Sequence, residues 1–118
     1  MFRAISLIII TNYFIITGKS GTLFIDDIGE GLDYERSIDL MRLITKKTKN
    51  SKLQVILTSN DRHLLNGIDV EHWNILERKG GEVRAYNYKN SKNAFDDFIA
   101  IGLNNFDLFS NEMYKTKE

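Results

Sequence analysis

TLFIDD at residues 22–27 and LQVILTSND at residues 53–61 are the two stretches that decide the expected fold. Each starts with a short apolar, partly β-branched run of the kind that forms a buried strand, and each ends in polar side chains. Between them, Asp33 is expected to cap a helix that continues to about Lys47 with its apolar residues on one face. A strand, a helix and a strand of this length form a parallel crossover unit, so we expect an α/β fold.

The sequence downstream of this unit predicts an antiparallel hairpin and a final helix. Residues 73–78 and 82–88 have the composition of two strands, and the Lys-Gly-Gly between them is typical of a tight turn. Ser91 is expected to cap a helix that ends near Gly102, and the apolar tail after this helix is expected to pack. Residues 115–118 are expected to fray.

Length and composition limit the functions that the chain can have. It has 118 residues, with 16 Lys plus Arg and 16 Asp plus Glu, so its formal net charge is zero. This length fits one small domain, and zero net charge argues that any contact with nucleic acid is indirect. The absence of cysteine excludes disulfides and thiolate zinc sites and favours a cytoplasmic location. His63 and His72 are too far apart to form a metal pair on one helix face.

Residues 4–17, AISLIIITNYFIIT, form the most apolar stretch of the chain. Polar residues such as Thr11 and Asn12 interrupt it, it is shorter than the roughly 20 residues of a bilayer span, and no small-residue cleavage site precedes Lys19. A signal peptide or membrane anchor is therefore the weaker alternative, and we expect no membrane association. Because the stretch is apolar all round, we expect a helix that is buried on nearly all sides inside a larger α/β domain and is covered by something else.

Both predicted strands end in side chains that can act on a ligand. In open parallel sheets, ligands sit beyond the carboxyl ends of the strands. Here the first strand ends in Asp26 and Asp27, and the second leads to Ser59, Asn60 and Asp61. Adjacent carboxylates suit a hydrated Mg²⁺ ion on phosphates, because one can hold the ion through water while the other orients an attacking water. The alternative is that Asp26 and Asp27 cap a turn and stay solvated.

Residues 23–33, LFIDDIGEGLD, resemble the Walker B and D-loop segment of ABC-type ATPases. In that family a hydrophobic strand leads to an Asp, a Glu and a short loop, followed by a small residue, Leu and Asp. Residues 55–61, VILTSND, resemble the next strand and its switch loop, where the family has Thr or Ser, then His, then Asp. The chain is similar in particular to AAA-family ATP-binding proteins with ABC-like heads. The resemblance implies a P-loop NTPase sheet and the cofactors ATP and Mg²⁺.

The resemblance also implies roles for five residues. Asp26 matches the Walker B aspartate, which holds Mg²⁺ through water. Asp27 and Asn60 occupy the two catalytic positions, where the family has a glutamate and the switch histidine. Asp33 and Ser59 are expected to contact the nucleotide, and Asp33 also to contact a second head in a head-to-head dimer. Because Asp27 is one methylene shorter than glutamate and Asn60 cannot carry the charge of histidine, we expect slow or absent hydrolysis.

The P-loop of the family is missing from this sequence. The Gly-Lys-Ser at residues 18–20 ends like such a motif, but position 13, where the first glycine would stand, is Tyr13. The tripeptide also directly precedes the strand that resembles Walker B. We therefore expect residues 1–118 to be a single partial domain, the C-terminal portion of an ABC-like ATPase head, which is inactive alone. Its expected partner is the missing N-terminal lobe that carries the P-loop, or an intact ATPase.

Two other functions remain open. One is a non-catalytic interaction module that derives from such a head and docks on an intact ATPase. The other is a receiver-like phosphoacceptor domain, because that fold also has an acidic pair such as Asp26 and Asp27 after a strand. The predicted hairpin at residues 73–88 stands where a receiver would have a further parallel strand with a lysine, and this weakens the receiver interpretation.

Overall fold

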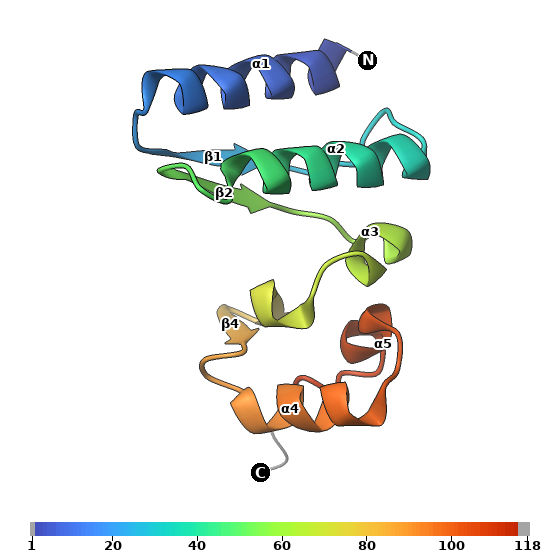
Figure 1. Ribbon diagram of the computed structural model, residues 1–118. Coiled ribbons are helices and arrows are strands. Elements are labelled where there is room, and N and C mark those ends of the chain that lie inside the picture. The colour runs from blue at the N-terminus through green and yellow to red at the C-terminus, as the bar shows by residue number, and fades with distance from the viewer. Residues whose placement is uncertain (1, 116–118) are drawn as a thin grey trace. The chain divides into compact units, whose positions relative to one another are not determined.

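The computed structural model describes residues 2–115, which belong to two compact units (Figure 1). Unit 1 extends to Leu64, and unit 2 begins at Leu65. The elements in chain order are α1 (Phe2–Thr17), β1 (Gly21–Ile25), α2 (Tyr34–Thr48), β2 (Leu53–Leu57), α3 (Arg62–Asn66), the 3-10 turn η1 (Val70–His72), β3 (Asn74–Lys79), β4 (Glu82–Asn87), α4 (Lys92–Ile101) and α5 (Asn105–Ser110). The chain is therefore mixed α/β, as the sequence predicts.

Unit 1 is built on a parallel pair of strands that are joined by α2. β1 and β2 pair in parallel over their full lengths. The carboxylate of Asp33 caps α2 by accepting a hydrogen bond from the backbone N–H of Arg36 at 2.9 Å. The predicted strand–helix–strand unit and its helix cap are confirmed, and α2 ends at Thr48, one residue beyond the predicted end.

The two faces of this sheet have different surroundings. On one face Ile25 and Leu53 are buried, together with the α2 residues Leu40, Met41 and Ile44. The other face is exposed, because Phe24 presents 71% of its surface and the opposite residue Ile56 presents 39%. Within residues 2–115, β1 and β2 pair only with each other, so the outer edge of each strand is open.

α1 lies beside α2 and runs antiparallel to β1 (Figure 1). Its end approaches the start of β1 so closely that a Cβ on Gly21 would lie 2.8 Å from the ring of Phe14. Within this chain only Leu7 and Thr11 of the helix are buried, so its burial on nearly all sides would require cover from outside the chain and stays a prediction. The opposite side is exposed and carries Phe2, Ile5, Ile9 and Ile16. The elements packed on α1 cover one of its sides. No helix among the described residues combines the length and apolarity needed to cross a membrane.

Unit 2 combines an antiparallel hairpin with two helices. β3 and β4 pair over their full lengths, and Gly80 in the turn has a φ of +60°. The predicted hairpin is confirmed, and its first strand begins one residue later than predicted. α4 ends at Ile101, and the following Gly102 has the left-handed φ of +75° expected of a glycine that caps a helix end. The tail packs as predicted, and the core of the unit consists of Val70, Trp73, Ile75, Phe95, Phe98, Leu108 and Tyr114.

Lys115 is held on the hairpin, so the predicted fraying is wrong at this residue. Its ammonium group lies 2.7 Å from the carboxylate of Glu77 and 2.6 Å from that of Glu112. The hydrogen bond from Lys115, with a further one from the phenol of Tyr86, lowers the pKa of the Glu77 carboxyl below its usual range. Residues 116–118, for which fraying is also predicted, lie outside the described residues.

Candidate functional site

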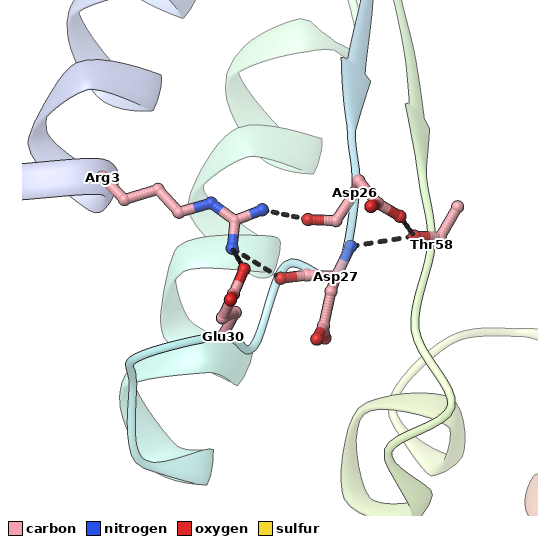
Figure 2. A network of polar contacts seen from close by, with 5 residues as sticks. All are labelled: Arg3, Asp26, Asp27, Glu30 and Thr58. Carbon is pink, nitrogen blue, oxygen red and sulfur yellow. Dashed lines mark hydrogen bonds and ion pairs between the residues drawn. The ribbon is translucent and has the colours of Figure 1, made fainter.

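The carboxyl ends of β1 and β2 meet at Asp26 and Thr58, the first residues after the two strands. The hydroxyl of Thr58 donates a hydrogen bond to Oδ1 of Asp26 at 2.6 Å and accepts one from the backbone N–H of Asp27 at 2.8 Å (Figure 2). The parallel register pairs Ile25 with Leu57, so Thr58 follows directly opposite Asp26. One threonine side chain therefore holds both acidic residues.

The backbone directly after β1 contains one extra residue relative to the end of β2. The N–H of Thr58 donates to the carbonyl of Ile25 at 2.9 Å, and the carbonyl of Thr58 accepts from the N–H of Ile28 at 3.2 Å. A regular parallel ladder would use the N–H of Asp27 for the second bond. Asp27 is therefore the inserted residue of a β-bulge. Its φ of +48° lies in the left-handed region, which aspartate tolerates better than most residues.

Asp27 and Asn60 line the same cavity, which has a volume of about 260 Å³. The carboxylate of Asp27 points away from that of Asp26 (Figure 2), as expected where a bulge redirects a side chain. Asn60 reaches the cavity from the segment after β2. The other lining residues are Gly29, Glu30, Leu32, Tyr34, Ser37, Asp61 and Leu64. The structure thus brings together the two residues that the sequence predicts to be catalytic.

The cavity is acidic, because Asp27, Glu30 and Asp61 all line it. Oε2 of Glu30 lies 3.2 Å from a guanidinium nitrogen of Arg3. Oδ1 of Asp61 accepts hydrogen bonds at 2.8 and 3.0 Å from the first backbone N–H groups of α3. Because like charges repel, these carboxylates oppose the entry of a phosphate group unless cations accompany it.

Arg3, in the first turn of α1, reaches the end of β1 from the side opposite to Thr58 (Figure 2). Its Nη1 donates a hydrogen bond to the carbonyl oxygen of Asp27 at 2.8 Å, and its Nη2 donates one to the carbonyl oxygen of Asp26. Together with the ion pair to Glu30, one guanidinium group binds three oxygen atoms. Arg3 therefore joins α1 to the acidic loop and brings a positive charge to it.

Asp33 and Ser59, the two residues expected to contact a nucleotide, are engaged in local structure. Asp33 caps α2, and its Oδ2 lies 3.4 Å from Nε of Arg36. The hydroxyl of Ser59 accepts a hydrogen bond from the backbone N–H of Asp61 at 3.0 Å. Neither Asp33 nor Ser59 is among the residues that line the cavity. The structure therefore brings Asp27 and Asn60 together in the cavity, whereas Asp26, Asp33 and Ser59 are not among its lining residues.

Asp26, the predicted metal ligand, has an exposed side chain directly after β1. Mg²⁺ is usually bound by one or two carboxylates together with water and phosphate oxygens. Asp26 and Asp27 supply oxygen donors of this kind, and Oδ1 of Asp26 is already bonded to Thr58. Within residues 2–115, no group of three or more His, Cys, Asp or Glu side chains could hold a metal ion. The chain by itself would thus supply only a part of a magnesium coordination shell.

Sequence reasoning did not find three residues of this site: Arg3, Thr58 and Tyr34. A signal existed for Thr58, because it directly follows the second predicted strand and the parallel register places it opposite Asp26. Tyr34 belongs to the predicted apolar face of the helix, yet it lines the cavity and its ring centroid lies 5.0 Å from that of His63. Arg3 contacts residues that are more than twenty positions away in the sequence, and no local sequence pattern predicts such a contact.

Comparisons with family models, with curated proteins and with solved structures found no match to this chain. The parallel unit of β1, α2 and β2 and the cavity at its carboxyl end are the observations from which a function can be inferred.

Proposed function

We propose that this chain is a cytoplasmic protein that supplies the Walker B and switch-loop side of an ATP-hydrolysing site. In this proposal the P-loop comes from an N-terminal ATPase lobe or from an intact ATPase, and the chain is inactive without it. One observation carries the proposal: Asp27 and Asn60 come from the ends of two parallel strands and line one cavity, with Asp26 as the adjacent residue. This arrangement agrees with the resemblance of residues 23–33 and 55–61 to ABC-type ATPases.

Each of the three residues has a role that suits its chemistry. Asp26 would hold Mg²⁺ through its water shell, and the ion would neutralise charge on the phosphates when it is bound. The carboxylate of Asp27 would accept a proton from the attacking water and orient it. The side-chain amide of Asn60 would donate a hydrogen bond to a phosphate oxygen. Asp27 and Asn60 already share the cavity in which such a water would lie.

The position of Lys19 supports the requirement for a separate P-loop. Lys19 precedes β1 while Asp26 follows it, so the two residues stand at opposite ends of a five-residue strand. At a rise of roughly 3.3 Å per residue they are on the order of 16 Å apart along the strand direction. The ammonium group of Lys19 donates a hydrogen bond to the hydroxyl of Tyr13 at 3.0 Å. The Gly-Lys-Ser tripeptide is therefore at the opposite end of β1 from Asp26, too far away to bind phosphates near that residue.

The purified chain is expected to show no ATP turnover in the presence of Mg²⁺. Charge-assisted contacts of phosphates are worth roughly 1.5–3 kcal/mol each, and most of those that a P-loop makes are missing. Phosphate release from Mg-ATP, measured with the 118-residue protein, checks this expectation. Saturable turnover that is abolished by Asp26→Ala would falsify it.

The positive part of the proposal is tested in a completed ATPase. The coding DNA directly upstream of Met1 is read for a P-loop, and the polypeptide that carries it is produced together with this chain. We expect ATP turnover that falls about 100-fold or more in Asp27→Ala, as is typical for the loss of a general base. Asp97→Asn, an exposed residue of α4 in unit 2, is the matched control and should leave turnover unchanged. Absence of a P-loop upstream excludes an N-terminal lobe as its source, and the same measurement is then made with an intact ATPase. Equal turnover in Asp27→Ala contradicts the proposal.

The exposed apolar surface favours a second candidate function, a non-catalytic module that docks on an intact ATPase. α1 exposes Phe2, Ile5, Ile9 and Ile16, and the sheet exposes Phe24. Surfaces of this kind commonly mark protein contacts. A docking module would bind an intact ATPase equally well when Asp26 is replaced by alanine, and the rate of that ATPase would not depend on Asp27. These two measurements separate the candidates.

A further inference from the structure

We propose that Arg3 is a positioning residue that holds Asp27 in its cavity-facing conformation. The proposal rests on the function proposed above, because it concerns the residue assigned there to orient water. Arg3 donates hydrogen bonds to the carbonyl oxygens of both Asp26 and Asp27 and forms an ion pair with Glu30 (Figure 2). It therefore binds both ends of the peptide segment whose backbone places the Asp27 side chain.

The acidic loop needs such a support because its backbone is irregular. Asp27 has a φ of +48°, a region in which residues other than glycine are disfavoured. Its N–H is bonded to the side chain of Thr58 in place of a ladder carbonyl. Residues in such conformations persist only where their surroundings fix them. Thr58 fixes the N–H side of Asp27, and Arg3 fixes its carbonyl side.

Arginine is suited to this task by the shape of its guanidinium group. The group is planar and presents five N–H donors in a rigid fork, so it can bind two carbonyl oxygens and a carboxylate at once. A lysine ammonium is a point charge on a flexible stem and reproduces the charge without the fork. Because Arg3 belongs to α1, the position of this helix is thereby coupled to the direction in which the Asp27 side chain points.

The test uses the full chain and the NMR signals of the acidic loop. In Arg3→Gln we expect the amide hydrogen of Ile28, which bonds to the carbonyl of Thr58, to exchange about tenfold faster or more. The three-bond HN–Hα coupling of Asp27, which reports φ, should move toward a conformational average. Arg3→Lys should resemble Arg3→Gln, because charge alone does not replace the fork. The thermal midpoint of each variant is measured alongside, so that a local effect is separated from global unfolding.

Arg42→Gln is the matched control, because it removes an exposed arginine from α2 in the same unit. It should leave the signals of Asp27 and Ile28 unchanged. Unchanged signals in Arg3→Gln, or equal changes in Arg42→Gln, overturn the proposal.

In the completed ATPase, Arg3→Gln should lower kcat for ATP about tenfold while KM stays the same. A change in KM alone also overturns the proposal. If the completed protein has no ATPase activity, the proposed function fails, and the NMR results still test the role of Arg3 on their own.

Discussion

At the scale of single residues, the site depends on how Asp27 and Thr58 share the end of the sheet. Asp27 is one of two residues other than glycine with a positive φ among residues 2–115. Aspartate adopts this conformation more readily than most residues do, and a glutamate has less of this tolerance. The local backbone therefore favours aspartate at the position where the resemblance to ABC-type ATPases would place a glutamate.

Replacing Thr58 by valine should destabilise unit 1 by about 1–2 kcal/mol. The substitution keeps the shape of the side chain and removes the hydroxyl. This hydroxyl donates a charge-assisted hydrogen bond to the carboxylate of Asp26 and accepts a hydrogen bond from the backbone N–H of Asp27. The free energy of unfolding is measured by urea titration with circular dichroism. Thr22→Val on β1 is the control, because the Thr22 hydroxyl makes a longer bond of 3.4 Å to Gln54 on the exposed face. Equal losses in the two variants would show that the strand-end bonds add nothing special.

At the scale of elements, residues 22–61 behave as their pattern predicts. Short apolar runs become β1 and β2, and Asp33 caps α2, because these features depend on neighbours in the sequence. The burial of α1 depends instead on elements that are distant in the sequence. Apolarity all round indicates that a helix can be buried, but its actual burial depends on how many elements pack on it, and here one side is covered. The bulge at Asp27 and the contact of Arg3 are likewise tertiary, so no local pattern reveals them.

The cap of α2 provides a prediction at this scale. Asp33→Ala should lower the free energy of unfolding by about 1 kcal/mol, because the N–H of Arg36 loses its acceptor. Asp33→Asn retains an oxygen acceptor and should lose less. Urea titration of the three proteins gives the comparison. If the alanine variant is as stable as the wild type, the hydrogen bond from Arg36 does not stabilise the helix.

At the scale of the whole molecule, the two compact units have separate cores, and each can be followed by its own signal. Trp73 is the only tryptophan of the chain and is buried in the core of unit 2, where its indole N–H donates to the carbonyl of Ile68 at 3.1 Å. Tryptophan fluorescence therefore reports the unfolding of unit 2. The site lies in unit 1, so changes at Asp27 or Arg3 should leave this signal in place.

Unit 2 should lose stability in acid through Glu77. Lys115 and Tyr86 lower the pKa of this carboxyl in the folded protein from its ordinary value of 4.5. A lowered folded pKa stabilises the fold above the ordinary value, and this contribution is lost as the pH falls through the lowered one. Urea titrations followed by the fluorescence of Trp73, at about pH 7 and about pH 3, should show a smaller loss in Glu77→Gln than in the wild type.

Glu71→Gln, an exposed residue of the turn η1, serves as the control for the acid titration and should behave as the wild type does. The carboxyl of Asp96 has a pKa that is lowered in the same way by Lys92 and Tyr88, so some acid sensitivity should persist in Glu77→Gln. An equal loss in Glu77→Gln and the wild type would mean that the contact with Lys115 does not link stability to pH.

The extra residue after β1 also changes the phase of side-chain alternation along the chain. Ile25 faces the helices, and a regular continuation would point residue 27 into the same core. Ile28, which is 0% exposed, occupies that inward place one position later. Two consecutive carboxylates can thus follow a buried strand, and the next residue, Ile28, again points inward. Because one residue is inserted, neither acidic side chain at this strand end has to occupy a position that points into the core.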